Sequence, residues 1–252
     1  MKSIDIYKNF VFALLFVGIN AAAQSGSIIP IHSKLEDKII DNYFKNTGGK
    51  DHWEKLQATK TEASMNASGM EVSMEYYQTK NGKQLYIIDF QGQKYTQSAF
   101  DGNVLWGTNP VGGETYKIED ASTIATMKNQ MKNFPSPFLN YKKKGFKVQS
   151  MGTETRNGIE MYKLKLTQPP SIVDGVETAN ISYHYFDTKS YFLIISENGD
   201  AKEQLTTITM GDYKESDGLY FPFSISIAGQ TLIIKKITPN PPINENMFSF
   251  PD

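Results

Sequence analysis

Alternating polarity is the feature that most constrains the fold of this chain. In two segments the apolar side chains occupy every second position: Met70, Val72, Met74 and Tyr76 in one, and Phe221, Phe223, Ile225 and Ile227 in the other. Because successive side chains of a strand point to opposite faces, this period of two predicts strands with one apolar face and one face in water. Such half-buried strands are typical of antiparallel sheets.

Similar runs recur from about residue 60 to residue 238. Turn signals such as Asn81-Gly82, Asn157-Gly158 and Asp217-Gly218 separate them, and dipeptides of this kind favour tight hairpin connections. The spacing therefore predicts an antiparallel meander of about 11 strands.

Helical spacing appears in two places. Near the start, Leu35, Ile39 and Tyr43 recur every four residues until Gly48-Gly49, and a short second helix is expected from Asp51. We therefore expect two helices before the first strand.

A further helix is expected at about 120–134. Asp120 or Ser122 can cap its start, and Pro135 ends it. Together these patterns predict a mainly β (α+β) fold. It consists of a single curved antiparallel sheet that forms an incomplete barrel, with the helices as a lid or plug, and it occupies one domain over residues 24–252.

Residues 1–23 have the pattern of a secretory signal peptide. Lys2 and Lys8 precede and flank an apolar stretch, Phe10–Ile19, and Ala21–Ala23 offers a cleavage site near Ala23. The stretch is shorter than the about 20 residues that span a bilayer. The chain has no cysteine for lipid attachment. We expect an exported, periplasmic protein that does not span the membrane once the signal is removed.

Residues typical of catalysis or metal binding are scarce. The chain has no cysteine and three histidines, His32, His52 and His184, and none of these stands at a metal-ligand spacing. His184 is out of phase with Tyr183 and Tyr185, so it is expected to face solvent. No nucleophile elbow or phosphate-binding loop is present. The sequence thus predicts no catalytic residue, metal or cofactor, and the net charge of −1 argues against nucleic acid as a partner.

Methionines suggest a binding site instead, because flexible thioether side chains suit both irregular cores and surfaces that take varied apolar ligands. Several lie on the first hairpin and others one turn apart on the middle helix. Ordinary core packing is the alternative for each of them. The candidate lining of a hydrophobic cavity is Met65, Met70, Val72, Met74, Ile88, Trp106, Ile124, Met127 and Met131.

Short motifs along most of the chain resemble those of one protein family. They are Thr47-Gly48-Gly49-Lys50 with Trp53, Phe100-Asp101-Gly102-Asn103 with Trp106, Phe186-Asp187-Thr188-Lys189, Asp217–Pro222, and Asn240–Asn244 through Met247-Phe248. The chain resembles the LolA/LolB-like outer-membrane lipoprotein-sorting proteins, in the form found in the envelope of Bacteroidetes.

The resemblance implies a half β-barrel with helices over a hydrophobic cavity, and a soluble carrier of an acyl chain or a lipidated protein. Partner proteins in the inner or outer membrane are then expected. The carrier of this family is known for an arginine at its cavity, whereas the only arginine here, Arg156, lies in an expected surface turn. The alternative is a secreted structural or interaction module of the same fold, with a filled core and no lipid.

Overall fold

Thirteen antiparallel strands form one curved sheet within the part of the chain that the structure describes. The computed structural model describes residues 35–67, 69–110, 112–173, 176–198 and 205–251. The strands are β1 (Ala58–Ala67), β2 (Met70–Thr79), β3 (Gln84–Phe90), β4 (Gln93–Phe100), β5 (Leu105–Thr108), β6 (Thr115–Ile118), β7 (Lys147–Arg156), β8 (Ile159–Val173), β9 (Val176–Asp187), β10 (Leu193–Asn198), β11 (Thr206–Ser216), β12 (Leu219–Ile227) and β13 (Gln230–Pro239). The expected signal peptide and cleavage site lie outside the described residues.

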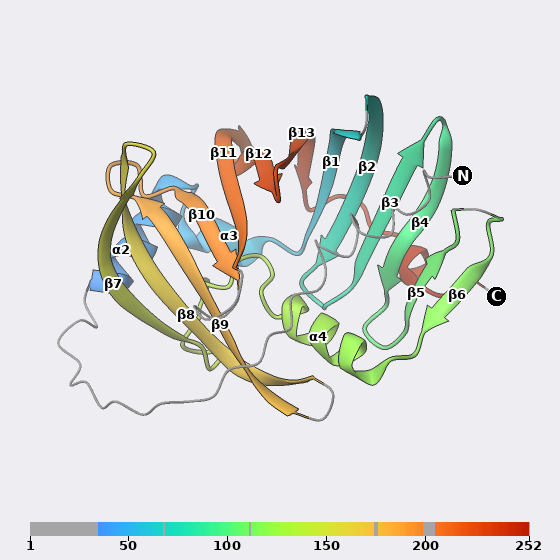
Figure 1. Ribbon diagram of the computed structural model, residues 1–252, viewed down its shortest axis with the longest axis horizontal. Coiled ribbons are helices and arrows are strands. Elements are labelled where there is room, and N and C mark those ends of the chain that lie inside the picture. The colour runs from blue at the N-terminus through green and yellow to red at the C-terminus, as the bar shows by residue number, and fades with distance from the viewer. Residues whose placement is uncertain (1–34, 68, 111, 174–175, 199–204, 252) are drawn as a thin grey trace.

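The strand order is β6-β5-β4-β3-β2-β1-β13-β12-β11-β10-β9-β8-β7. Two meanders are thus joined where β1 pairs with β13, and the sheet arches from β7 on one side to β6 on the other (Figure 1). The described residues show no pairing between β6 and β7, which confirms an unclosed sheet. The expected count of about 11 is slightly too low.

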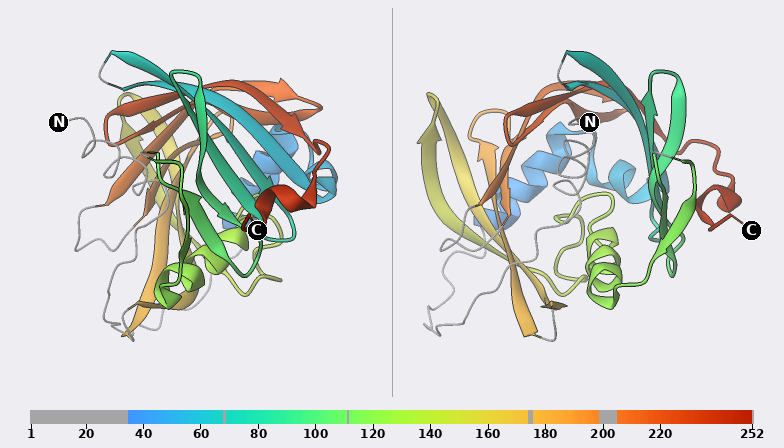
Figure 2. Two further views of the ribbon diagram at one scale, coloured as in Figure 1. Left: turned by 90° about the vertical axis from the view of Figure 1, so that its right-hand side faces the viewer. Right: turned by 45° about the vertical axis from the view of Figure 1, so that its right-hand side comes forward.

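The helices are α2 (Leu35–Asn46), α3 (Lys50–Lys55), α4 (Ala121–Met131) and the 3-10 turn η1 (Glu245–Phe248). Figure 2 shows α2 and α3 on the inner side of the arch and η1 on its outer side. The Asp120 side chain caps α4 by accepting a hydrogen bond from the backbone N–H of Thr123 (2.7 Å). This helix ends at Met131 and not at the expected residue 134, because the chain between Met131 and Pro135 forms a turn.

Gly48 lets the end of α2 approach the turn between β11 and β12. Its φ is 113°, and a Cβ there would lie 2.1 Å from the carbonyl oxygen of Gly218. The backbone N–H of Tyr220 donates to the carbonyl of Thr47 (3.1 Å). Two motifs far apart in the sequence therefore meet at one backbone contact that only glycine fits.

The main core lies between α2, α3, residues 134–146 and the concave face of the sheet. Aromatic rings pack edge to face there. The ring centroids of Tyr43 and Phe186 are 5.5 Å apart, and those of Trp53 and Phe221 are 5.2 Å apart. Edge-to-face pairs of this kind add to the stabilisation from burying apolar area. The alternating strands thus turn their apolar faces inward, as the period of two predicts.

His184 lies inside this core, so the expectation that it faces solvent is wrong. Its ring is 6% exposed, packs edge-on against Phe138, and hydrogen bonds to the hydroxyls of Ser182 (2.8 Å) and Ser196 (2.9 Å). Tyr185 lies on the other face of β9 and is also buried. Because both faces of β9 are covered, alternation alone does not identify the inner one.

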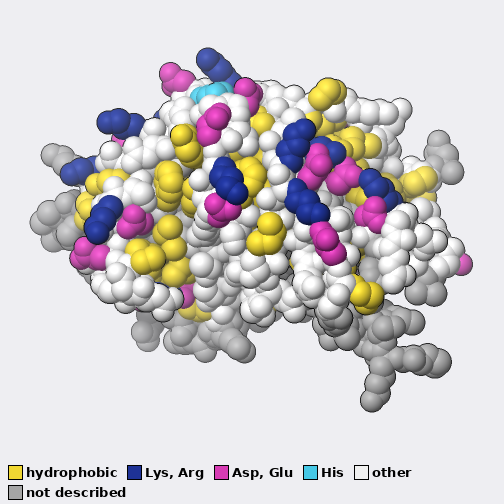
Figure 3. All heavy atoms as spheres, turned by 90° about the horizontal axis from the view of Figure 1, so that it is seen from above, with side chains coloured by type: hydrophobic (Ala, Val, Ile, Leu, Met, Phe, Trp, Pro, Cys, Tyr) yellow, Lys and Arg dark blue, Asp and Glu magenta, His cyan; other side chains and the backbone are white. Residues whose placement is uncertain are grey.

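The outer face of the sheet carries paired charges. Lys60 lies 3.0 Å from Glu75, and Lys94 lies 2.7 Å from the same carboxylate. Viewed from above, the molecule shows basic and acidic side chains next to each other, with apolar ones scattered among them (Figure 3). We therefore find no single-sign field on this side that would attract a polyanion.

Candidate functional site: an apolar cavity with one polar wall

A cavity of about 440 Å³ opens on the concave side of the sheet. The helices α2 and α3, the strands β1 to β4 and β10 to β13, and the turn after α4 all contribute to it. Its lining consists of Tyr43, Trp53, Leu56, Thr59, Thr61, Ala63, Met74, Tyr76, Gln78, Tyr86, Ser98, Phe134, Pro135, Leu193, Met210, Tyr213, Phe221, Pro222, Ile225, Leu232, Ile234 and Ile237.

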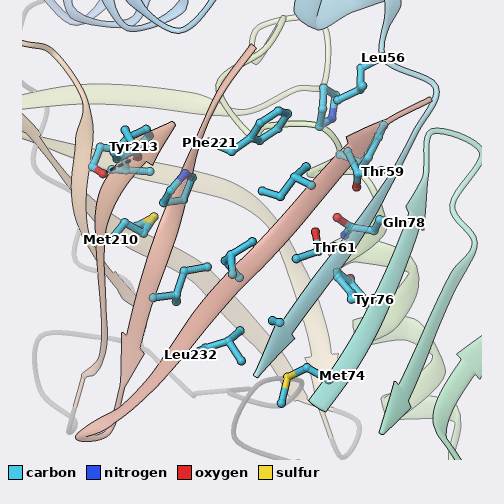
Figure 4. A pocket seen from close by; sticks show the side chains of 18 of the residues that line it. Leu56, Thr59, Thr61, Met74, Tyr76, Gln78, Met210, Tyr213, Phe221 and Leu232 are labelled. Atoms are coloured by element: carbon cyan, nitrogen blue, oxygen red, sulfur yellow. Dashed lines mark hydrogen bonds between the residues drawn. The ribbon is translucent and has the colours of Figure 1, made fainter. Parts of the chain in front are cut away.

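One wall of the cavity is apolar. Phe221 and Ile225 reach it from β12, while Leu232 and Ile234 reach it from β13. Figure 4 shows Phe221 and Leu232 on these two strands. These strands are neighbours in the sheet, and their inward positions are the apolar members of the alternating pattern. The outward neighbour Ile233 is 50% exposed. The apolar wall therefore consists of side chains that the alternating pattern places on the inward face of these strands.

The adjoining wall, which begins at β1 beside β13, is polar, and strand register aligns its residues in two adjacent rows. In the first row Thr59 pairs with Gln78, and Gln78 with Gln84; in the second, Thr61 pairs with Tyr76, Tyr76 with Tyr86, and Tyr86 with Ser98. Figure 4 shows Thr59, Thr61, Tyr76 and Gln78 gathered on this side. The next row, Ala63, Met74 and Ile88, is apolar again. The polar groups are therefore confined to one part of the cavity.

Hydrogen bonds within the polar wall are incomplete. The Tyr76 hydroxyl donates to Oε1 of Gln84 (3.0 Å). Gln84 is fully buried and Ser98 is 4% exposed, yet Gln84 Nε2 and Ser98 Oγ have no hydrogen-bond partner among the described residues. Burial raises the pKa of the Tyr76 and Tyr86 hydroxyls above their usual range, so both are neutral. Buried polar groups are almost always paired, and these two need another explanation.

The described lining contains no aspartate, glutamate, lysine, arginine or histidine. Arg156 lies on the other face of the sheet, where its guanidinium forms ion pairs with Glu154 and Glu197 and contacts the Tyr185 hydroxyl. It thus lies at the end of β7, away from the cavity. The described residues also hold no group of three or more acidic, histidine or cysteine side chains placed to bind a metal.

Of the residues proposed from the sequence as cavity lining, Met74 lines the cavity. Met65, Val72 and Ile88 are buried in the same core cluster as Met74, next to the cavity but not in its wall. The first hairpin therefore presents its inward face to the core as the alternation implies. Met70, near the hairpin tip, is 37% exposed.

The remaining proposed residues lie elsewhere. Ile124, Met127 and Met131 of α4 pack on Phe100 and Leu105 in a separate cluster. The sequence-based picture of a methionine-lined helix facing a methionine-lined hairpin across a gap is not what these contacts show. In place of α4 itself, the turn that follows it reaches the cavity through Phe134 and Pro135.

Trp106 lies on the outer face of the sheet. Its ring packs against Phe250, and it shares a buried cluster with Phe248, Leu85 and Ala99. The C-terminal segment covers this patch, and Figure 2 shows η1 outside the arch. Trp106 therefore stabilises the attachment of the tail.

Sequence reasoning did not identify the polar wall. Thr59, Thr61 and Gln78 are not singled out by the alternation, because period-two patterning identifies the inward face of a strand by its apolar residues. A signal was present in part: Tyr76 continues the inward series of β2, and Thr61 lies opposite it once the hairpin register is drawn. Polar residues in phase with an apolar face are the pattern that marks such a wall.

Solved structures share this fold at low sequence identity. A DUF1329 family protein from Desulfovibrio piger superposes with a TM-score of 0.53 at 17% identity, over 84% of this chain and 96% of that one. A LolA superfamily protein from Nitrosomonas europaea gives 0.52 at 12% identity, over 85% and 97%. A structure described as an outer membrane lipoprotein-sorting protein domain, from Vibrio parahaemolyticus, gives 0.50 at 14% identity, over 84% and 94%.

These similarities establish a LolA-like fold. No protein-family model matches the sequence, and no curated protein does. Among the described residues, no helix combines the length and the apolar character needed to cross a membrane.

Proposed function

We propose that this chain is a non-catalytic carrier that holds an acyl chain, free or attached to a lipoprotein, in the cavity of the sheet. The observation that supports this most directly is the cavity itself. Its volume of about 440 Å³ lies within the range of about 300–1,000 Å³ that is usual for ligand sites. Its lining is largely apolar and, in the described residues, uncharged.

The energetics of this proposal are favourable. Each methylene transferred from water contributes about 0.8 kcal/mol, and a cavity bounded by Phe221, Ile225 and Leu232 provides the apolar contacts that such a chain needs. Ordering of the chain and of side chains offsets part of this gain. An acyl chain of ordinary length would still bind firmly enough to be carried.

Location and origin belong to the same proposal. The pattern of residues 1–23 supports export and cleavage near Ala23, and the fold is shared with a LolA superfamily protein and a lipoprotein-sorting domain. We therefore propose a periplasmic location, and the short motifs between Thr47 and Phe248 support an organism of the Bacteroidetes type. Partner proteins in the inner or outer membrane would deliver and receive the ligand.

The alternative is an interaction module without a lipid ligand, whose aromatic C-terminal segment would bind a partner. Against this, Phe248 is fully buried on the sheet and its carbonyl accepts a hydrogen bond from Trp106. A segment held in this way is part of the fold, and the buried Phe248 side chain is not accessible to a partner. The cavity favours the carrier.

Mass spectrometry of gently purified protein tests the proposal. We expect a stoichiometric acyl-bearing molecule in the native spectrum, lost on denaturation. As a second measurement, diphenylhexatriene, an uncharged hydrocarbon fluorophore, should bind and be displaced by acyl lipids. Protein that is free of lipid after every preparation and that does not bind diphenylhexatriene contradicts a carrier function.

A further inference from the structure

We infer that the polar wall is a head-group subsite that selects acyl ligands with an uncharged polar end, such as a glycerol ester, over free fatty acids and anionic phospholipids. This inference rests on the proposed function, because it presupposes that an acyl chain occupies the cavity. It adds the class of ligand and the residues that determine specificity, Ser98 and Tyr76, with Gln84 as the residue that positions the Tyr76 hydroxyl.

Register places the subsite next to the acyl-binding surface. The polar rows end where the row of Ala63, Met74 and Ile88 begins, and the apolar wall of β12 and β13 continues from there. A molecule with one polar end and one apolar chain matches this division. An unsubstituted hydrocarbon would leave the polar rows without a partner.

An unpaired donor indicates what the subsite would bind. Ser98 lines the cavity, and its Oγ is buried without a partner among the described residues. Gln84 Nε2 is also unpaired, but Gln84 does not line the cavity; its carbonyl oxygen holds the hydroxyl of Tyr76, which does. A buried unpaired donor costs free energy that a ligand acceptor recovers. Ester carbonyl and hydroxyl oxygens are acceptors of the required kind.

Charge excludes the ionised lipids. A carboxylate or phosphate taken out of water needs a cation or a full set of donors to offset its desolvation, and the described lining supplies no lysine, arginine or histidine. The hydroxyl and amide groups of the wall match neutral oxygens. Discrimination therefore arises from the cost of burying the wrong head group as much as from contacts with the right one.

Competition for bound diphenylhexatriene tests the selectivity on the purified protein. Three ligands with the same oleoyl chain are compared at pH 8: 1-monooleoylglycerol, sodium oleate and oleoyl lysophosphatidylglycerol. We expect monooleoylglycerol to bind at least about tenfold more tightly than either anion, since an unpaired buried charge costs more than one hydrogen bond contributes. Equal or tighter binding of the anions overturns the inference.

Variants locate the selectivity. Ser98→Ala and Gln84→Met should each weaken monooleoylglycerol binding about three- to tenfold, as expected for one lost hydrogen bond, and leave diphenylhexatriene binding unchanged. Ser73→Ala is the matched control, because alternation places Ser73 on the outer face of β2. The free Ser98→Ala protein should unfold at the same temperature as wild type or higher, because it loses a buried group that has no partner. Gln84→Met also removes the acceptor of the Tyr76 hydroxyl, so it should unfold at a lower temperature. A lower unfolding temperature of Ser98→Ala, or unchanged monooleoylglycerol binding, contradicts the subsite.

The outcomes separate this inference from the proposed function. If diphenylhexatriene binds and all three lipids bind with equal affinity, the head-group subsite is contradicted but the carrier function is not. Failure of every probe to bind removes both.

Discussion

The indole N–H of Trp106 donates a hydrogen bond to the backbone carbonyl of Phe248, 2.8 Å away. This contact joins β5, near one edge of the sheet, to the C-terminal turn. Phe248 is fully buried against Leu85 and Ala99, so the tail completes the outer side of strands whose inner side faces the cavity.

Removal of the Phe248 side chain should therefore destabilise the whole domain. We expect Phe248→Ala to lower the free energy of unfolding by about 3 kcal/mol or more, as for other large-to-small changes in cores. Trp106→Phe keeps an aromatic ring, but the ring is smaller and the carbonyl loses its donor, so the change should cost about 1 kcal/mol or more. Urea unfolding measures both. A Phe248→Ala protein as stable as wild type would show that the tail is not part of the core.

Gly48 and Gly49 form a matched pair at the end of α2. Both have a positive φ, but only at Gly48 would a Cβ collide, with the carbonyl oxygen of Gly218; nothing lies within 4 Å of a Cβ at Gly49. Gly48→Ala should thus be more destabilising than Gly49→Ala by roughly 2 kcal/mol, because backbone strain is common to the two and overpacking is not. Equal unfolding midpoints for the two variants would contradict this backbone contact.

Filling the cavity should block binding without unfolding the protein. Leu232 is half-buried and lines the cavity, whereas its neighbour Ile233 points outward. Leu232→Trp should reduce diphenylhexatriene binding by about tenfold or more, since the added ring occupies the volume that the probe needs. Ile233→Trp is the control and should bind normally. Unimpaired binding by a folded Leu232→Trp protein would locate the ligand elsewhere.

His184 should make stability depend on pH. Burial lowers the pKa of His184 to about 3 in the folded protein, from an ordinary value of 6.5. Between these values the unfolded chain binds the additional proton, so the free energy of unfolding falls as the pH drops below 6.5. From pH 6.5 to pH 5 the loss should be about 2 kcal/mol, at about 1.4 kcal/mol for each pH unit.

Urea unfolding between pH 7.5 and pH 5 measures this dependence, in a range where most carboxylates remain ionised in the unfolded chain. His184→Gln should flatten the profile. An unaltered slope in His184→Gln would mean that this imidazole is protonated in the fold.

Much of the architecture was predictable from the chain. The alternation around Met74 and Phe221 indicated the inward faces, the positions of Asp120 and Gly48 indicated helix ends, and the unclosed sheet agrees with the incomplete barrel expected. These features are local, because each depends on a few neighbouring residues.

The composition of the cavity was less predictable. Whether Thr61 faces a cavity or solvent depends on which face of β1 is covered, and His184 was misjudged for the same reason on β9. Trp106 lies outside because the C-terminal turn covers it, a contact between segments far apart in the sequence. Such pairings are decided by tertiary packing, which periodicity does not encode.

The missing ladder between β6 and β7 has a mechanical consequence. In a closed barrel the circumference is fixed by a complete ring of main-chain hydrogen bonds. Here the described strands leave one seam unbonded, and α4 spans it by packing on Phe100 and Leu105 at one margin and contacting β8 at the other. Widening of the seam breaks no strand pairing, so no main-chain hydrogen bond across it fixes the girth of the molecule, which could adjust to the thickness of the acyl ligand we propose.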